Sequence, residues 1–224
     1  MSWEILAAEI HSDFHHPPVH ESVDSLVRHF ASDAARARAP LRNPHHEDRV
    51  SEDVKLRARP CAVLIPIVER ARELSVLLTR RHHEISYAGH ICFPGGRRDS
   101  GDANAEETAL REAREEIALD SGRVRVLGRL GDYVTQTGFR IAPVVGIVSP
   151  PVELSPRAGE VEEILEIPLA HLLRADSYRL ARRGSEADTA VFFLEYESAI
   201  ITGPTVSLLM GFYEELLKTH ELDG

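Results

Sequence analysis

From residue 61 onward the sequence alternates short runs of branched apolar residues with short polar breaks, and this pattern restricts the fold most. Residues 61–69 (CAVLIPIVE) and 75–81 (SVLLTRR) are typical of two strands, and the break between them suits a hairpin loop. Further strands are predicted over residues 90–93, 124–130, 132–136, 140–148 and 189–197, and helices over residues 105–119, 167–175 and 204–220. Because the strand spacing favours hairpins, we expect an α/β sandwich with a mixed sheet rather than a doubly wound sheet.

The first 57 residues differ in character, since they are polar and rich in His, Pro and Arg. Within them, residues 22–39 are predicted to form a short amphipathic helix because apolar side chains recur at helical spacing, and residues 41–60 to form a linker or a surface wrap. The histidine-rich residues 11–20 lack cysteines or carboxylates in register, so we expect an arm there rather than a metal site. We therefore predict an N-terminal helical extension over residues 1–57 and one domain over residues 58–224.

The net charge of −10 argues against a general nucleic-acid-binding surface. An acidic surface also repels a phosphorylated substrate unless metal ions or local arginines reverse the field at the site. Cys61 and Cys92 lie in apolar runs and are expected to be buried thiols rather than a disulfide framework or a zinc site. The N-terminus lacks the features of a secretory signal, and the longest apolar run, residues 62–68, is too short to span a bilayer. We therefore expect a cytoplasmic protein with no membrane partner.

Residues 108–119 (TALREAREEIAL) form a predicted helix with two distinct faces. One face carries apolar residues at helical spacing and should be buried: Leu110, Ala113 and Ile117. Another carries three glutamates at the same spacing: Glu112, Glu115 and Glu116. Like charges on adjacent turns cost a few tenths of a kcal/mol per pair, so something should offset them. The helix is either an ordinary solvated one, with ion pairs to Arg111 and Arg114, or the binding site of a divalent cation.

A glycine turn, FPGG at residues 93–96, comes shortly before this helix. Glycine permits backbone conformations that other residues resist and lets the main chain approach a ligand closely. Mg²⁺ and Mn²⁺ bind carboxylate oxygens, bridge the phosphate oxygens of a substrate and lower the pKa of a bound water. If the turn places a diphosphate next to metal-binding carboxylates, this explains why the glycine turn directly precedes the glutamate-rich helix. The proximity of the two features therefore favours a metal site over an ordinary solvated helix.

Together these features resemble the Nudix box, G-x5-E-x7-R-E-U-x-E-E-x-G-U, in which U is a bulky apolar residue. Residues 111–119 (REAREEIAL) match its second half, although Ala113 is small for U and Ala118 replaces the late glycine. The interval between the glycine turn and the arginine is one residue longer than in the general box, which places Asp102 near the position of the first glutamate. The resemblance implies a Nudix-type α/β/α sandwich with a mixed sheet and metal-dependent hydrolysis of a nucleoside diphosphate derivative.

Further segments resemble the coenzyme A pyrophosphatase branch of that family. They are residues 77–81 (LLTRR), 135–148 (TQTGFRIAPVVGIV), 160–173 (EVEEILEIPLAHLL) and 201–209 (ITGPTVSLL). The resemblance covers about residues 58–217 and implies cleavage of coenzyme A or acyl-CoA to 3′,5′-ADP and (acyl-)4′-phosphopantetheine. One departure is that the loop between Thr79 and Gly89 is one residue short, with Ser86 or Tyr87 where the branch has an arginine. The alternatives are hydrolysis of ADP-ribose, NADH or another nucleoside diphosphate, and a non-catalytic nucleotide-binding sensor.

The resemblance also implies roles for single residues. The expected metal ligands are Gly96, Glu112, Glu115 and Glu116. Arg111 is expected to orient a glutamate through a charge-assisted hydrogen bond, and the base that deprotonates the attacking water is Glu115 or Glu160. The expected substrate contacts are Arg80, Arg81, Gly95, Gly96 and Phe139. The implied cofactor is Mg²⁺ or Mn²⁺, and the implied partners are a small-molecule nucleoside diphosphate and, by analogy within the fold, a second copy of the chain in a homodimer.

Overall fold

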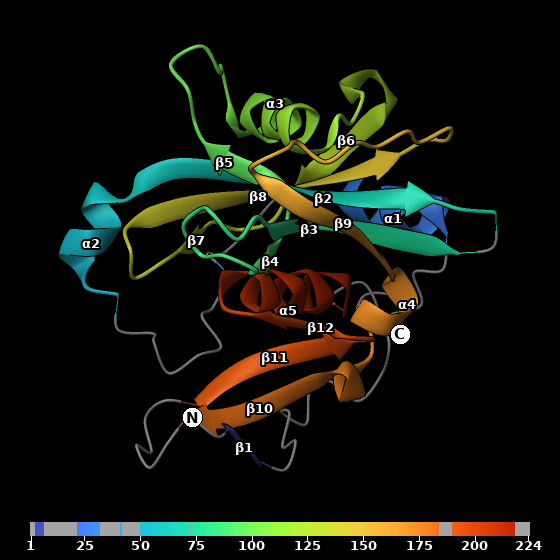
Figure 1. The fold of residues 1–224 in the computed structure, drawn as a ribbon. Helices are drawn as coiled ribbons and strands as arrows, with labels where there is room; N and C mark the ends of the chain where they lie inside the picture. Colours follow the sequence, from blue (N-terminus) through green and yellow to red (C-terminus); the bar gives the residue numbers. More distant parts are fainter. Residues whose placement is uncertain are drawn as a thin grey trace.

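The computed structural model describes residues 3–6, 22–31, 41, 50–71, 73–183 and 190–217. A mixed sheet of eight strands forms its centre (Figure 1). In chain order these strands are β2 (Arg59–Glu69), β3 (Leu74–Arg81), β4 (Ile91–Cys92), β5 (Gly95–Arg97), β6 (Val124–Arg129), β7 (Tyr133–Val134), β8 (Phe139–Val148) and β9 (Val161–Pro168). The main path runs β4-β3-β2-β8-β6, with β5 paired to β2, β7 to β8 and β9 to β3. Strands β2 and β8 are parallel and the other pairs antiparallel, which confirms the predicted mixed sheet.

Helices cover both faces of this sheet. Helix α3 (Ala105–Ile117) packs on one face, where Ala109, Ala113 and Ile117 join a buried cluster with side chains of β2, β3 and β8. On the other face lie α1 (Val23–Ala31), α4 (Leu169–Leu172) and α5 (Pro204–Leu217). Leu26 and Phe30 of α1 are buried there, so the apolar side of this N-terminal helix packs within its own chain.

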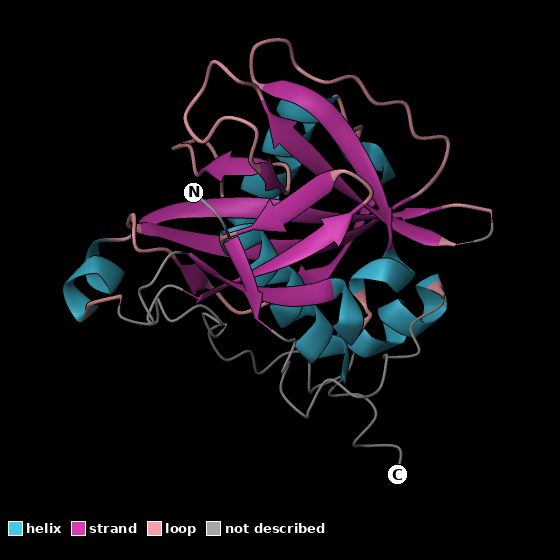
Figure 2. Ribbon diagram, turned by 60° about the horizontal axis from the view of Figure 1, so that its bottom comes forward, coloured by secondary structure: helices cyan, strands magenta, loops and turns pink. Residues whose placement is uncertain are grey.

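A second, smaller sheet lies beyond α5 (Figures 1 and 2). It is antiparallel, in the order β1 (Trp3–Leu6), β10 (Tyr178–Arg183), β11 (Ala190–Tyr196) and β12 (Ala199–Thr202). Helix α5 is therefore enclosed between two sheets, and residues on all its sides are buried, including Ser207 and Gly211. The predicted closing helix is confirmed over this range, and its residues 218–220 lie outside the described part of the chain.

Five strands were not predicted from the sequence: β1, β5, β9, β10 and β12. The predicted helix at residues 167–175 is only the four residues of α4, and the segment before it is strand β9. The glutamates of β9 are not typical of a strand, and this is why β9 was not predicted. In the structure, Glu163 and Glu166 form ion pairs with arginines of the neighbouring β2–β3 hairpin. Strands β10 and β12 flank β11, which alone of the second sheet was predicted.

Two shorter elements also differ from expectation. The expected linker contains a helical turn, α2 (Glu52–Arg57), whose N-terminus is capped by the Ser51 side chain and which buries no residue. The expected glycine turn is strand β5, hydrogen-bonded to β2. The histidine-rich residues 11–20 and the predicted helical residues 32–39 lie outside the described ranges.

None of the helices in the described ranges is both long enough and apolar enough to cross a bilayer. The cytoplasmic location stays a prediction.

Candidate active site

The carboxylate helix α3 is held firmly at both ends. At its start, Asn104 caps the helix by accepting a hydrogen bond from the Glu107 N–H at 2.9 Å. At its end, Ala118 adopts a left-handed conformation with φ 55° in place of the usual glycine. The loop that follows β8 then covers the helix end, because the N–H groups of Ser155 and Arg157 donate to the carbonyls of Ile117 and Glu116 at 3.0 and 2.8 Å. The helix is thus a fixed platform for its side chains.

Glu116 is a buried carboxylate on this platform, with 8% of its surface exposed. Its Oε2 accepts a hydrogen bond from the Gly95 N–H at 3.1 Å. Burial raises the pKa of Glu116 to about 7, and the neighbouring charges of Glu112 and Glu160 add to this rise, while the Gly95 hydrogen bond and Arg81 oppose it. Burial also raises the pKa of Glu112. Two neighbouring acids with raised pKa values make this region a candidate functional site.

The two glycines of β5 are required by close packing. A Cβ on Gly96 would lie 2.5 Å from the carboxyl carbon of Glu112, and a Cβ on Gly95 would lie 2.5 Å from the carbonyl oxygen of Ala62. Neither residue is among the glycines with positive φ. The expectation of an unusual backbone conformation was therefore wrong. The close neighbour of Gly96 is the carboxylate of Glu112, and the close approach to a ligand stays a prediction.

Arg111 is fixed beneath the glutamates. Its guanidinium donates twice to Asp102, from Nε to Oδ1 at 3.1 Å and from Nη2 to Oδ2 at 3.0 Å, and once to the Arg97 carbonyl at 3.0 Å. These hydrogen bonds hold the pKa of Asp102 well below its usual range. Nη1 of Arg111 lies 3.0 Å from Glu112 Oε1 and 3.4 Å from Glu115 Oε1. This geometry suits the expected role of Arg111 in orienting a glutamate. It also shows that Asp102, which the sequence placed only near the first glutamate of the Nudix box, holds the Arg111 guanidinium.

Glu160 lies outside the helix, in the turn directly before β9, and its side chain reaches the same region. Nη1 of Arg157 lies 3.4 Å from Glu160 Oε2 and 3.8 Å from Glu115 Oε2, so one guanidinium joins the two candidate bases. The His82 N–H donates to the Glu160 carbonyl at 2.9 Å and fixes its main chain. Arg157 was not anticipated from the sequence, because it lies outside the segments that resemble the family.

The expected substrate-binding residues are spread more widely. Arg81 is close enough to Glu116 to lower its pKa, and its Nε donates to the Ser86 carbonyl at 2.9 Å. Arg80 instead pairs with Glu163 on β9, at 2.9 Å. Phe139 begins β8 and stacks beneath the guanidinium of Arg59, 4.2 Å from the ring centre. Arg81 and the two glycines therefore lie at the carboxylates, whereas Arg80 and Phe139 contact other groups.

A divalent cation suits the donor set of this site. Across the residues that the structure describes, no three acidic, imidazole or thiol groups converge as a complete ligand set, and Glu112 and Glu115 contact Arg111. The donors are nevertheless hard oxygens, two of them are desolvated, and the Glu112 carboxylate packs directly against the main chain of Gly96. Glu112, Glu115 and Glu116 are the residues that would hold the ion.

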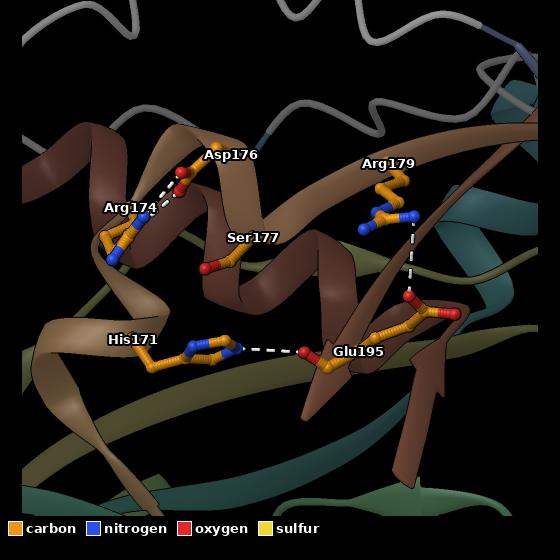
Figure 3. Close-up of a pocket in the computed structure, with 6 residues that line it drawn as sticks. All are labelled: His171, Arg174, Asp176, Ser177, Arg179 and Glu195. Atoms are coloured by element: carbon orange, nitrogen blue, oxygen red, sulfur yellow. Dashed lines mark hydrogen bonds and ion pairs between the residues drawn. The ribbon is translucent and has the colours of Figure 1, made fainter. Parts of the chain in front are cut away.

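A second gathering of charged side chains lies beside helix α4 (Figure 3), which packs on the opposite face of the central sheet from α3 (Figure 1). It forms a hollow of about 230 Å³ between α4, the 3₁₀ turn Ala175–Ser177 and the second sheet, lined by His171, Arg174, Asp176, Ser177, Arg179 and Glu195. Each charge there has a partner of opposite sign: Arg174 pairs with Asp176, and Arg179 lies 3.7 Å from Glu195. The hollow holds balanced surface ion pairs.

Known proteins of one family are similar to this chain. A model of the NUDIX domain matches residues 58–186. The uncharacterized Nudix hydrolase NudL of Citrobacter koseri is 39% identical over 158 residues, 69% of this chain and 81% of that protein. The NudL of Yersinia enterocolitica is 41% identical over 151 residues, 66% of this chain and 76% of that protein. Among solved structures, the M. smegmatis Nudix hydrolase RenU overlaps with a TM-score of 0.49 at 17% identity, over 74% of this chain and 87% of that one.

Proposed function

This chain belongs to the Nudix hydrolases, which act on nucleoside diphosphate derivatives, and we propose that its substrate is coenzyme A or an acyl-CoA. The products would be 3′,5′-ADP and 4′-phosphopantetheine or its acyl derivative. The observation that carries the proposal is the pair of desolvated carboxylates, Glu112 and Glu116, packed directly against the glycines of β5. The resemblance of residues 77–81, 135–148 and 160–173 to the coenzyme A branch supports the choice of substrate.

The residues of α3 divide the work of the proposed reaction. Glu112, Glu115 and Glu116 would hold Mg²⁺ or Mn²⁺, which neutralises phosphate charge and makes the attacking water more acidic. Arg111, fixed by Asp102, keeps two of these carboxylates in place. The catalytic domain is proposed to span residues 58–224, with residues 1–57 as an extension whose helix α1 packs on it.

The chemistry itself is an attack of water on one phosphorus of the diphosphate. A new P–O bond forms, the bridging P–O bond breaks, and the water's proton passes to a carboxylate. That base is Glu115 or Glu160, because both contact the same guanidinium of Arg157 and so border one space. Gly95, Gly96 and Arg81 border the carboxylates and are the proposed contacts of the diphosphate.

A substrate panel tests the proposal. The purified protein is incubated with coenzyme A, acetyl-CoA, dephospho-CoA, ADP-ribose and NADH, with Mg²⁺ or Mn²⁺, and the products are identified by mass spectrometry. We expect coenzyme A to be cleaved fastest, and dephospho-CoA to show a substantially lower kcat/KM because it lacks the 3′-phosphate. Faster cleavage of ADP-ribose or NADH would move the chain to another Nudix substrate class. Full activity in a Glu115→Gln, Glu116→Gln double variant would refute the assignment of the site.

A further inference from the structure

Two arginines contact Glu115, and they differ in how firmly they are held. Arg111 is 20% exposed and has three further hydrogen bonds, two to Asp102 and one to a main-chain carbonyl. The Arg157 side chain is 49% exposed, and it forms ion pairs of 3.4 and 3.8 Å to Glu160 and Glu115. Such long, exposed contacts are weak, so the Arg157 guanidinium can leave its position at little cost.

The main chain of Arg157, by contrast, is anchored. Its N–H donates to the Glu116 carbonyl at 2.8 Å, and its own carbonyl accepts hydrogen bonds from the N–H groups of Glu160 and Val161 at 3.2 and 3.0 Å. The residue is therefore tied to the end of α3 and to the start of β9 at once. Because the main chain is anchored, the long and loosely held Arg157 side chain stays within reach of the carboxylates in any of its conformations.

The position of the guanidinium brings it into conflict with a divalent cation. A cation held by Glu115 would lie near the positive charge of Arg157, because both interact with the same carboxylate, and like charges at such short range repel. Guanidinium groups also bind phosphate oxygens strongly and with defined geometry. A diphosphate brought to the carboxylates therefore offers Arg157 a new partner in the same neighbourhood.

We propose that Arg157 exchanges partners in the course of the reaction. Its guanidinium balances Glu115 and Glu160 in the absence of a divalent cation and turns to a negatively charged oxygen of the diphosphate when cation and substrate are bound. This inference rests on the proposed function, since it requires both the cation and a diphosphate. Arg157 is then a substrate-binding residue that also sets the affinity of the carboxylates for the ion.

The test measures the Kd for Mn²⁺ and the KM for coenzyme A. If Arg157 had a purely structural role, its substitution would not lower the first and raise the second. Mn²⁺ affinity is measured by electron paramagnetic resonance without substrate, and KM for coenzyme A is measured separately. In Arg157→Gln, the Kd for Mn²⁺ should fall about twofold to fivefold, since one weak competing ion pair is removed. The KM should rise about fivefold to tenfold, since a charge-assisted contact to the diphosphate is lost. Arg157→Lys should restore both values in part.

Arg123→Gln is the matched control. The Arg123 side chain is 40% exposed, and its Nη1 donates to the Pro150 carbonyl at 3.2 Å, so it anchors the other end of the same loop. It should leave both quantities unchanged. If Arg157→Gln matches this control in either quantity, the inference is overturned. If the unsubstituted protein neither binds Mn²⁺ nor cleaves a diphosphate, the proposed function fails instead.

Discussion

The site at α3 and the hollow at His171 both gather acidic and basic side chains, but their charges are arranged differently. In the hollow, Arg174 and Asp176 are both exposed and satisfy each other, as Arg179 and Glu195 do at longer range. At α3, acids outnumber the bases that contact them, and Glu116 is almost fully buried among other carboxylates. Balanced surface pairs contribute little to stability or chemistry, whereas an uncompensated buried charge costs stability and is retained where it has a function. Charge imbalance therefore distinguishes the proposed active site from the hollow, whose charges are balanced.

The largest expected effect is a loss of kcat when two of the carboxylate charges at α3 are removed. The Glu115→Gln, Glu116→Gln double variant should lose about 10²- to 10⁴-fold in kcat, because both cation binding and one candidate base are affected. Initial rates of diphosphate cleavage measure the loss. The variants Asp176→Asn and Glu195→Gln, made in the hollow, should keep the unsubstituted rate. A loss of activity in the hollow variants would show that charge imbalance does not distinguish the proposed active site from the hollow.

The next effect concerns the glycine against Glu112. Gly96→Ala places a methyl group where the Glu112 carboxyl lies, so this carboxylate must move while the fold is retained. We expect kcat to fall about 10- to 100-fold, as is typical of a small misplacement in an active site. Gly101→Ala is the control, since its added Cβ has no heavy atom within 4 Å. Equal rates in the two variants would show that the position of Glu112 is unimportant.

The pH dependence of stability tests whether the buried Glu116 carboxylate at α3 destabilises the fold when it is ionised. The pKa of Glu116 is about 7 in the fold and near 4.5 in the unfolded chain, so the folded state binds its proton more tightly. The stabilisation from the protonated group is complete below pH 4.5 and is lost as the pH rises through 7. In EDTA, the free energy of unfolding should therefore fall by about 2 kcal/mol between pH 5 and pH 8 from this group.

Urea unfolding at the two pH values measures this change. Glu116→Gln keeps an acceptor for the Gly95 N–H but cannot ionise, so it should show a smaller fall and be the more stable protein at pH 8. Glu195→Gln should leave the fall unchanged. An identical pH dependence in Glu116→Gln would mean that this carboxylate is not the destabilising charge.

The smallest effect is expected where the two regions should behave alike. Ala118 at the end of α3 and Glu197 in the turn between β11 and β12 both have positive φ, at 55° and 52°. Glycine adopts this conformation without the steric cost of a Cβ, so Ala118→Gly and Glu197→Gly should each stabilise the fold by up to about 1 kcal/mol. Thermal unfolding measures both. Destabilisation by either substitution would show that the side chain makes a contact worth more than the relieved strain.

The sequence was informative wherever the interaction is local. The spacing of Glu112, Glu115 and Glu116 on one helix could be predicted because helical geometry depends on neighbouring residues alone. The same reasoning predicted a buried stripe of Leu110, Ala113 and Ile117, of which Ala113 and Ile117 are buried and Leu110 is partly buried. These residues are close in the chain, and no knowledge of the tertiary fold was needed.

The remaining features depend on contacts that are distant in the chain. The burial of Glu116 depends on β5, and the position of Arg157 depends on the loop after β8 folding back over the end of α3. Strand β9 was missed because its glutamates are polar in sequence, yet Arg70 and Arg80 neutralise two of them across the sheet. Such partners become visible only once the strands are placed side by side.

The enclosure of α5 between two sheets has a consequence for how the chain is made. Helix α5 follows every described strand of both sheets in chain order, so a ribosome completes both sheets before it completes the helix that fills the space between them. Until that helix emerges, the nascent protein presents two apolar surfaces to its surroundings, which is the kind of exposure that chaperones bind. The proposed active site at α3 lies on the opposite face of the central sheet from this last helix.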